Sequence, residues 1–393
     1  MSTPRHDVVV VGARCAGAAT ALLLARMGHD VVLVDRFRSP GDTLSTHGLA
    51  RGAVVQLARW ALLDAVLASG APPVRAVTFG QGEDVVTRRI KDRAGVDHLV
   101  APRRHALDRL LLDAAVSAGA TMCAEGTVTG VSRDTAGRVD GVMVRRPDGS
   151  LFEARARVVV GADGLRSRVA REVGAAVQER FVARTATFYA YVAGDWHAYE
   201  FHVAPRAFAG VFPTHGGEAC VWLARPTHHL AALRHAGVGR TAALLAELDT
   251  VVPQLARRVR DGRVTSPVRG AVNLPNHVRV PSGPGWALVG DSGYHRDPIT
   301  GHGITDAFRD AELVAVAIDH SLGSPADERD AMDAFRHQRD TALREVFGLT
   351  RALATFPHPD RFVELQIQLS EALEREADLL AAFPPPAGAA QAA

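Results

Sequence analysis

The chain opens with a hydrophobic pattern that changes its spacing twice near the N-terminus. Val8 to Val11 form a continuous run of β-branched residues, which is typical of a strand buried on both faces of a parallel sheet. Residues 16–27 are rich in Ala and Leu and favour a helix, and Gly28 suits the C-terminal end of that helix. A second valine-rich run covers residues 31–34. The pattern predicts a βαβ unit with two parallel strands.

The rest of the chain also mixes helical and strand patterns. Alternation of apolar and polar residues between 184 and 225 predicts antiparallel strands of a second, mostly β domain. Other strands are expected within residues 74–100, from 121 onward, over 127–133, 139–146 and 150–157, and in the buried runs at 158–162 and 286–291. Further helices are expected over residues 53–67, 101–119, 228–247, 303–322, from 326 onward and over 361–383.

The composition is that of an ordinary globular protein. Of the 393 residues, 47% are hydrophobic and 22% are charged, and 45 basic residues nearly balance 43 acidic ones. This balance gives no indication of a nucleic-acid partner. Cys15, Cys123 and Cys220 have no metal-ligand spacing, so we expect no metal and a reducing, cytoplasmic compartment. Since no apolar run is long enough to span a bilayer, we expect no membrane partner.

The turn between the first strand and the first helix has the spacing of a dinucleotide site. It reads Gly12-Ala13-Arg14-Cys15-Ala16-Gly17, and Asp35 lies about as far downstream as a ribose-binding carboxylate should. A helix N-terminus behind a glycine turn is the usual seat of a pyrophosphate. Arg14 replaces the second glycine, and its guanidinium either points away or lies near a phosphate. The alternative is an ordinary turn without a ligand.

Two later stretches repeat the arrangement of a buried strand followed by a turn. In residues 158–171, a valine run ends on Asp163-Gly164. In residues 285–304, a buried strand ends on Gly290-Asp291, and Pro298, Gly301 and Gly303 then lead into a helix. The last stretch therefore combines a carboxylate with a helix N-terminus, whose free N–H groups carry a partial positive charge.

In this order, the three stretches resemble the FAD-dependent monooxygenases related to p-hydroxybenzoate hydroxylase, a group that extends to the geranylgeranyl reductases and flavin halogenases. The resemblance covers residues 5–320. It implies an α/β fold with a Rossmann-type FAD-binding domain of the p-hydroxybenzoate hydroxylase/glutathione reductase kind, a second antiparallel β substrate domain and C-terminal helices. The expected bounds are 1–72, 101–175 and 275–322 for the discontinuous FAD-binding domain, 73–100 and 176–274 for the substrate domain, 323–383 for the C-terminal helices and 384–393 for a disordered tail.

The resemblance also implies roles for individual residues. The first turn would contact the FAD pyrophosphate, Asp35 the adenosine ribose, and Asp291 the ribityl chain or pyrophosphate. The Asp163-Gly164 pair would contact both FAD and NAD(P)H. The helix that starts near Gly303 would favour the anionic side of a reduced flavin. The expected cofactor-binding residues are Gly12, Ala13, Arg14, Cys15, Ala16, Gly17, Asp35, Arg36, Arg104, Val128, Asp163, Gly164, Gly290, Asp291, Pro298, Gly301, Gly303 and Ile304.

The departures from the wider group narrow the expected activity. The chain lacks the Trp-x-Trp-x-x-Pro signature of the halogenases, and residues 208–214 lack the Trp and Lys that prenyl reductases carry there. We therefore expect a monooxygenase in which NAD(P)H reduces FAD and a flavin C4a-hydroperoxide oxygenates an aromatic or hydrophobic small molecule with O2. The alternative is an FAD-dependent reductase or dehydrogenase of a hydrophobic, prenyl-like substrate. A dinucleotide-binding protein without turnover is a third hypothesis.

The substrate side leaves several interpretations open. Ten of the 22 aromatic residues lie between Phe181 and Trp222, either as the wall of a substrate pocket or as packing between strands. No catalytic residue is assigned, because much of the oxygen chemistry belongs to the flavin. His47, Tyr294 and His295 are candidates for acid–base chemistry, with a structural hydrogen-bonding role as the alternative.

The helix expected over 361–383 carries Leu365, Leu369 and Leu373 on one stripe. This stripe is either a dimer contact or lid, or a face packed on the body of the protein. We expect a monomer or a homodimer.

Overall fold

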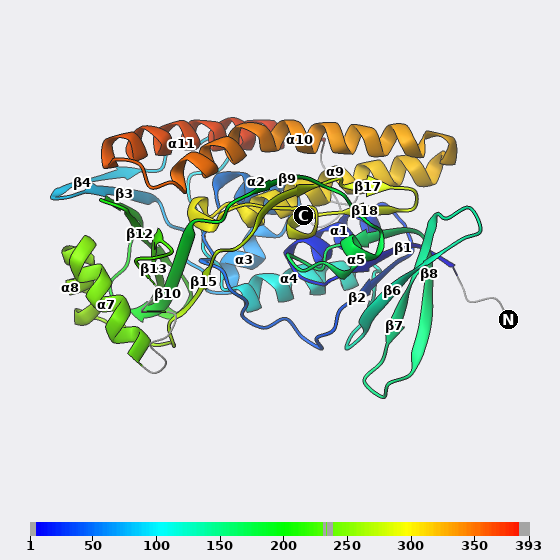
Figure 1. Ribbon diagram of the computed structural model, residues 1–393, viewed down its shortest axis with the longest axis horizontal. Coiled ribbons are helices and arrows are strands. Elements are labelled where there is room, and N and C mark those ends of the chain that lie inside the picture. The colour runs from blue at the N-terminus through cyan, green and yellow to red at the C-terminus, as the bar shows by residue number, and fades with distance from the viewer. Residues whose placement is uncertain (1–4, 231–232, 234–238, 385–393) are drawn as a thin grey trace.

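A computed structural model describes residues 5–230, 233 and 239–384 of the protein (Figure 1). The first βαβ unit forms as predicted, from β1 (Arg5–Val11), α1 (Cys15–Arg26) and β2 (Val31–Val34). β1 pairs in parallel with β2 on one side and with β8 (Leu151–Gly161) on the other. It therefore lies inside a sheet whose parallel strands have the order β18-β8-β1-β2-β5, in which β5 covers Thr121–Cys123 and β18 covers Trp286–Leu288. The same sheet also contains β17 (Ser282–Gly283), β6 (Thr127–Arg133) and β7 (Val139–Arg145).

Alternate residues of β1 belong to two different hydrophobic clusters. Val8 and Val10 pack with helices on one face of the sheet, and Val9 and Val11 pack with β7 on the other. A strand buried on both faces must be apolar at every position, which is the pattern seen in the sequence. The helices on the first face are α1, α2 (Arg51–Arg59), α3 (Leu63–Ala68), α4 (Arg104–Ser117) and α9 (Gly303–Gly323).

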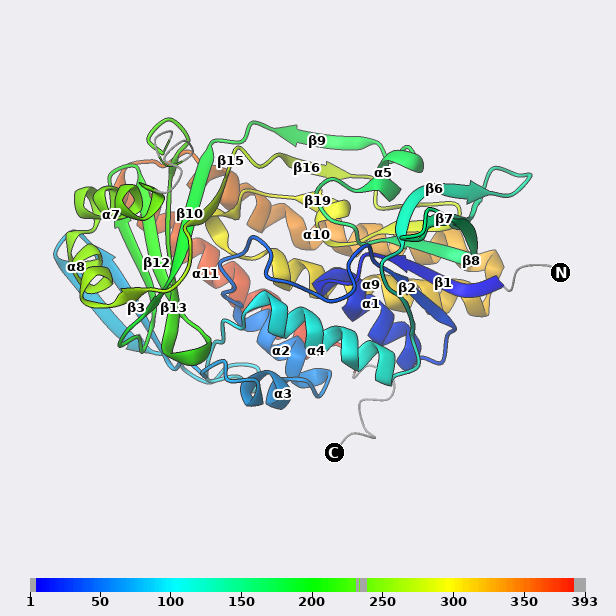
Figure 2. The same ribbon diagram turned by 90° about the horizontal axis from the view of Figure 1, so that it is seen from below.

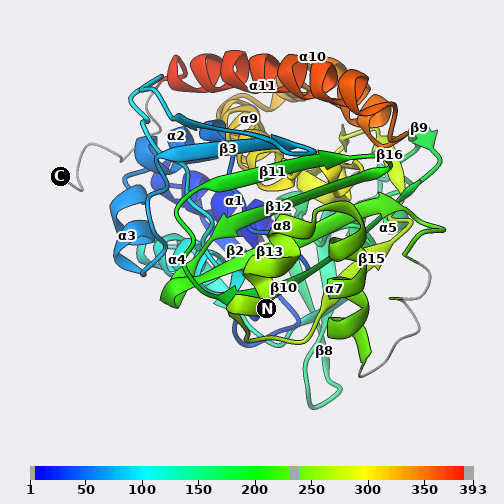
Figure 3. The same ribbon diagram turned by 90° about the vertical axis from the view of Figure 1, so that its left-hand side faces the viewer.

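The second sheet has the order β14-β10-β13-β12-β11-β3-β4, with β15 also paired to β10. Most of its strands are antiparallel, as predicted, but β11 and β3 are parallel neighbours. The strands are β3 (Ala76–Gln81), β4 (Asp84–Arg89), β10 (Thr185–Ala193), β11 (Tyr199–Ala204), β12 (Ala207–Pro213), β13 (Glu218–Pro226), β14 (Arg263–Val264) and β15 (Arg269–Val272). Helices α7 (Arg240–Val251) and α8 (Pro253–Asp261) cover one face of this sheet (Figure 3).

Three further elements connect the two large sheets. A small sheet of β9 (Val177–Phe181), β16 (Asn276–Arg279) and β19 (Tyr294–His295) runs between them (Figure 2). The long helices α10 (Glu328–Leu353) and α11 (Pro359–Ala381) lie across both parts of the molecule.

The remaining helical elements are short. The 3-10 turns are η1 (His215–Gly217), η3 (Gly290–Ser292), η4 (Pro298–Thr300) and η5 (Pro325–Asp327), and α5 (Arg168–Glu172) follows β8. Among the described helices, none combines the length and the apolar character needed to cross a membrane.

The structure corrects several predicted elements. The helix predicted over 53–67 is divided into α2 and α3, because Ala61 between them has φ +57°. The strands predicted at 150–157 and 158–162 are one strand, β8, because Arg155 pairs with both β7 and β1. The strand predicted over 286–291 ends at Leu288, where the chain enters η3. Much of the helix predicted over 228–247 and nearly all of the predicted disordered tail lie outside the described residues, and α7 begins only at Arg240.

Candidate functional site

A cavity of about 970 Å³ gathers the three sequence stretches into one place. Its wall contains every predicted cofactor-binding residue except Ala13 and Gly17. The cavity continues past the 298–304 turn to the second sheet, where Thr187 and Tyr189 line it. The predicted catalytic candidates His47, Tyr294 and His295 line it as well. Segments far apart in the chain therefore meet because the carboxyl ends of β1, β2, β8 and β18 share one edge of the sheet.

The two remaining glycines of the first turn are required by the chain itself. Gly12 has φ +103°, and a Cβ atom there would lie 2.5 Å from the carbonyl oxygen of Ala162. A Cβ atom on Gly17 would lie 1.8 Å from the carbonyl oxygen of Gly12. The N-cap residue Arg14 makes no side-chain cap, and no acidic residue lies in the first turn of α1. The first turn of α1 thus carries no negative charge of its own that would repel an anionic ligand.

Asp108 is a buried residue of this region that the sequence patterns did not identify. Its carboxylate accepts hydrogen bonds from the Cys15 N–H at 3.1 Å and from Arg104, whose Nη2 lies 2.9 Å away. The Cys15 thiol donates to the same carboxylate at 2.9 Å, and burial holds the pKa of this thiol well above its usual value. Arg104 and Asp108 are four residues apart on α4, which is the spacing of a helical ion pair and the available sequence signal. The pair fixes α4 against the start of α1.

Asp35 and Arg14 connect the first turn to the loop that follows β2. Asp35 accepts hydrogen bonds from the Ala13 N–H at 2.7 Å and the Phe37 N–H at 2.8 Å. Arg14 Nη1 donates to Thr43 Oγ1 at 2.7 Å, and the guanidinium lies 5.7 Å from the centre of the Phe37 ring. The Arg14 side chain therefore follows the cavity wall, where its charge is available to a phosphate.

We predict that Arg14→Gly weakens FAD binding by about 10–100-fold, because one charge-assisted contact to a phosphate is worth roughly 1.5–3 kcal/mol. The measurement is a titration of the apoprotein with FAD, followed by quenching of flavin fluorescence. Thr43→Val is the matched control, because it removes the partner of Arg14 and keeps the guanidinium. An unchanged or higher affinity in Arg14→Gly would show that the side chain is only tolerated in the turn.

The two acidic residues of the later stretches differ in their surroundings. Asp163 caps α5, since it accepts hydrogen bonds from Ser167 Oγ at 2.5 Å and from the Val169 N–H at 3.1 Å. Asp291 is exposed in the cavity, and its carboxylate has no hydrogen-bond partner in the described part of the chain. Gly290, with φ +57°, donates its N–H to Asp310 at 3.2 Å and so turns the backbone toward the cavity. Asp291 is the carboxylate that is free to accept from a ligand.

A buried network of charges lies at the start of α9. His302 contacts Glu376 of α11 at 2.7 Å, and Arg309 contacts both Glu376 at 2.7 Å and Asp306 at 3.0 Å. Arg296 lies 2.5 Å from the other oxygen of Asp306. His302, Asp306 and Glu376 are close enough together to hold a metal, but two arginines already neutralise their carboxylates. We interpret the cluster as an ion-pair network that ties α11 to the 298–304 turn.

The structure gives Tyr294 and His295 structural partners. The Tyr294 hydroxyl accepts a hydrogen bond from Arg309 Nη2 at 2.7 Å, and burial raises the pKa of this tyrosine well above its usual value. His295 Nδ1 lies 2.6 Å from the carbonyl oxygen of Pro275 and so donates to it. Both contacts fit the structural alternative proposed for these residues.

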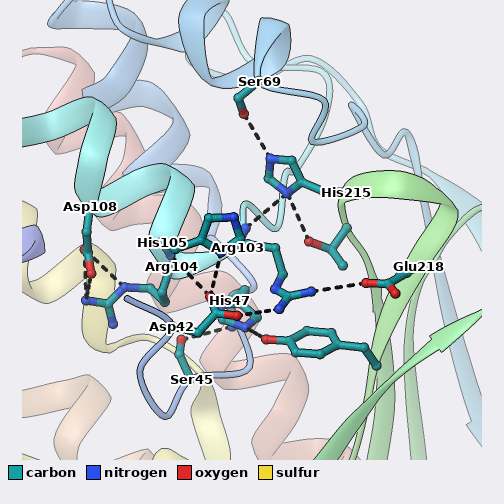
Figure 4. Close-up of polar contacts among 12 residues, drawn as sticks. Asp42, Ser45, His47, Ser69, Arg103, Arg104, His105, Asp108, His215 and Glu218 are labelled. Carbon is teal, nitrogen blue, oxygen red and sulfur yellow. Dashed lines mark hydrogen bonds and ion pairs between the residues drawn. The ribbon is translucent and has the colours of Figure 1, made fainter. Parts of the chain in front are cut away.

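His47 is buried between the cavity and the second sheet (Figure 4). Its Nε2 shares a hydrogen bond with the Tyr191 hydroxyl, and the Arg103 guanidinium lies 3.6 Å from the centre of the Tyr191 ring. Its Nδ1 is buried without a hydrogen-bond partner in the described residues. Burial, followed by the charge of Arg104, lowers the pKa of His47 to about 3, so the ring is neutral at neutral pH.

The lowered pKa of His47 predicts a pH-dependent stability. Below pH 6.5 the unfolded chain binds a proton on this ring, whereas the folded chain does not until about pH 3, so stability is lost as the pH falls through this window. The test variant is His47→Asn, because asparagine tolerates the observed φ of +67°. Between about pH 7.5 and 4, its free energy of unfolding should fall by roughly 2–3 kcal/mol less than that of the wild type. Urea unfolding of the apoprotein over this pH range measures the difference. The same dependence of the free energy of unfolding on pH in both proteins would contradict the lowered pKa of His47.

Asp297 is a second buried group that the sequence patterns did not identify as a candidate. It lines the cavity, is 3% exposed, and caps η4 by accepting the Ile299 N–H at 3.1 Å. Burial raises the pKa of this carboxyl, and the nearby Thr185 hydroxyl and His295 oppose that shift. Unlike Asp306, it pairs with no arginine among the described residues. A buried carboxyl without a counter-ion beside a cavity is a candidate acid or base.

The aromatic residues of the second sheet mostly serve packing. Of the ten between Phe181 and Trp222, Tyr189 lines the cavity. Phe208 and Trp222 belong instead to a core that includes Phe362 and Leu365 of α11. The leucine stripe of α11 is thus buried on the body of the protein, which was the alternative to a lid or dimer contact.

The fold and the cavity together define a flavoenzyme of the p-hydroxybenzoate hydroxylase type, as the resemblance predicted. The chain belongs to the FAD binding domain family, whose model matches residues 5–348. It is therefore an FAD-dependent oxidoreductase.

Relatives and solved structures agree with this family. The chain is 26% identical over 355 residues to digeranylgeranylglycerophospholipid reductase of Methanocella arvoryzae, over 87% of this chain and 84% of the relative. It is 29% identical over 335 residues to menaquinone reductase of Mycolicibacterium smegmatis, over 79% and 76% of the two chains. The fold is similar to that of P. aeruginosa PqsL in complex with 2-aminobenzoylacetate, with a TM-score of 0.80 and 23% identity over 93% of this chain and 100% of that one.

The residues present fit FAD. The first turn of α1 carries no acidic residue, and Asp291 offers an unpaired carboxylate to the cavity. At the other end of the cavity, His302 Nδ1 and Arg296 Nε are buried without a hydrogen-bond partner in the described residues. We propose that the predicted residues hold FAD, with the pyrophosphate at the first turn, the adenosine ribose at Asp35 and the ring beside residues 301–304.

Proposed function

We propose that the protein is a monooxygenase that uses NAD(P)H and O2 to hydroxylate or otherwise oxygenate a compact aromatic or hydrophobic molecule. The overall reaction takes one substrate C–H group, NAD(P)H, a proton and O2, and yields a C–OH group, NAD(P)⁺ and water. FAD supplies the chemistry of hydride acceptance and oxygen activation. The protein then has to bind the substrate, exclude water and handle one proton.

The observation that carries this proposal is the lining of the cavity on the side of the second sheet. The second sheet and the loop after it contribute Thr187, Tyr189, Ala271 and Leu274 to the cavity wall. Beyond Tyr189, side chains of α11 fill the aromatic face of the sheet. A wall that combines a polar turn with one aromatic ring suits a compact ring system better than an extended prenyl chain.

A second candidate function is favoured by the names of the relatives. At 26% and 29% identity over most of both chains, those relatives are named as reductases of a digeranylgeranyl lipid and of menaquinone. In that function the protein would reduce a carbon–carbon double bond of a hydrophobic substrate, and O2 would take no part.

One set of experiments separates the two functions. The holoenzyme is reduced without air, mixed rapidly with oxygenated buffer, and followed through the flavin absorbance with and without phenols, anilines or 2-aminobenzoylacetate. A monooxygenase gives an absorbance transient before reoxidation and a product that carries ¹⁸O from labelled O2. Direct reoxidation with every compound, together with anaerobic hydrogenation of a geranylgeranyl lipid or menaquinone, would replace this proposal with the reductase function.

We further propose Asp297 as the group that exchanges a proton with the substrate. Asparagine caps a turn as well as aspartate does, so Asp297→Asn should keep its fold and FAD affinity. Loss of an acid or base usually costs about 10²–10⁴-fold in rate. We expect a loss of this size in the oxygenation of any phenol that the wild-type protein accepts, and an unchanged rate of FAD reduction by NAD(P)H. Equal losses in both steps would indicate a structural role for Asp297.

A further inference from the structure

The strand β4 forms an open edge of the second sheet. It pairs with β3 on one side and has no strand neighbour among the described residues on the other (Figure 1). Residues 82–89 are all exposed, with Val85 and Val86 each at 51%, and Phe79, which lies opposite Val86, is 46% exposed. An exposed edge strand with apolar side chains is a template for pairing with another chain.

The charges along this edge form a mirrored pattern. Glu83 and Asp84 precede Val85, Val86 and Thr87, and Arg88 and Arg89 follow them. When two copies of this segment run antiparallel about Val86, each acidic end lies opposite the basic end of the other copy. Edges that are protected against pairing often carry charged side chains, especially lysines, which repel a second copy of the same edge. A pattern that is acidic at one end and basic at the other attracts its own copy instead.

The backbone directions select the same alignment. A two-residue turn, Gly82-Glu83, joins β3 to β4, and Gly82 has φ +62°. The residues that flank such a turn form a hydrogen-bonded pair, so Asp84 bonds to Gln81, and every second residue of β4 then bonds to β3. Val85 and Thr87 must direct their N–H and C=O groups outward.

This alternation limits how a second copy can pair. Outward-directed residues can bond only to outward-directed residues, so the two-fold axis has to pass through a residue and not between two residues. With the axis at Val86, Val85 of one copy bonds to Thr87 of the other. Asp84 and Arg88 then meet at a non-hydrogen-bonded pair, where side chains approach most closely. The charge pattern and the hydrogen-bond pattern therefore require the same register.

The apolar residues also suit this register. Phe79 and Val86 are opposite each other in β3 and β4, so they lie on one face of the sheet. The axis places Val86 against its own copy, and the two Phe79 rings extend the apolar surface on either side. The ion pairs would border this surface at both ends.

We propose that the protein forms a two-fold symmetric homodimer in which the β4 strands of two copies pair antiparallel about Val86. The second sheet of one copy, which has eight strands, then joins the second sheet of the other copy as one continuous sheet. The proposal does not depend on the reaction that the enzyme performs.

The first test is the molecular mass of the FAD-loaded protein by light scattering and sedimentation between about 1 and 100 μM. We expect twice the chain mass of 41.8 kDa. Asp84→Arg places like charges opposite each other at both symmetric sites, and Arg88→Asp does the same with acids. Each should raise the dissociation constant about tenfold or more. The double variant Asp84→Arg/Arg88→Asp restores opposite charges and should restore the dimer.

A backbone variant tests the direction of the hydrogen bonds. Thr87→Pro removes an N–H that β3 does not use, so it should leave the fold and FAD content intact while abolishing the dimer. Asp113→Arg on α4 is the matched control, since it reverses another exposed acid, which lies away from β4, and should leave the dimer unchanged. A wild-type protein that is monomeric at every concentration, a dimer that Asp84→Arg leaves intact, or a double variant that stays monomeric would overturn the proposal.

Discussion

Replacement of Gly17 by alanine is expected to destabilise the apoprotein by about 3 kcal/mol or more. The added Cβ would lie 1.8 Å from the carbonyl oxygen of Gly12, so α1 must move away from the first turn. Alanine improves helix propensity by about 1 kcal/mol, which does not offset a shift of a helix that is buried between α4 and α9. Urea unfolding of the apoprotein, followed by far-UV circular dichroism, measures the loss.

Two other glycines provide controls for this prediction. An added Cβ meets nothing within 4 Å at Gly41, which lies in a loop, or at Gly303, which starts α9. Gly41→Ala and Gly303→Ala should both unfold at nearly the wild-type urea concentration. If Gly17→Ala unfolds at the same urea concentration as these two variants, the close approach of α1 to the turn does not limit the stability of the protein.

Replacement of Asp291 by alanine is expected to raise the dissociation constant of FAD by about 10–100-fold, since hydrogen bonds to a charged group contribute roughly 1.5–3 kcal/mol. The side chain is exposed in the cavity and has no hydrogen-bond partner in the described residues, so the stability of the apoprotein should change little. FAD titration and urea unfolding of the same variant separate the two effects.

Asp291→Asn keeps an oxygen acceptor and loses the charge, so its FAD affinity should fall between those of the wild type and Asp291→Ala. A fully loaded Asp291→Ala protein with wild-type affinity would rule out this carboxylate as a cofactor contact. Loss of stability in the apoprotein would instead show that Asp291 supports η3.

The features that local sequence predicted share a local cause. The valine runs, the Ala-rich helix and the turn from Gly12 to Gly17 depend on backbone conformation and on burial on both faces, and each leaves a periodic or glycine signature. Most of the predicted cofactor-binding residues also line one cavity, because the ends of parallel strands meet at one edge of the sheet. The division of the helix predicted over 53–67 escaped prediction, because it depends on a turn at Ala61 between α2 and α3.

The sequence by itself determined the βαβ unit, the three turns and hence the dinucleotide-binding class of the protein. Only the tertiary structure decided which polar groups are buried together and which aromatic residues reach the cavity. Asp108 meets Cys15, Asp297 lies beside the cavity, and α11 covers the aromatic face of the second sheet, all through contacts between distant segments. Such contacts carry no periodic signature, because burial and charge pairing depend on the neighbours that folding brings together.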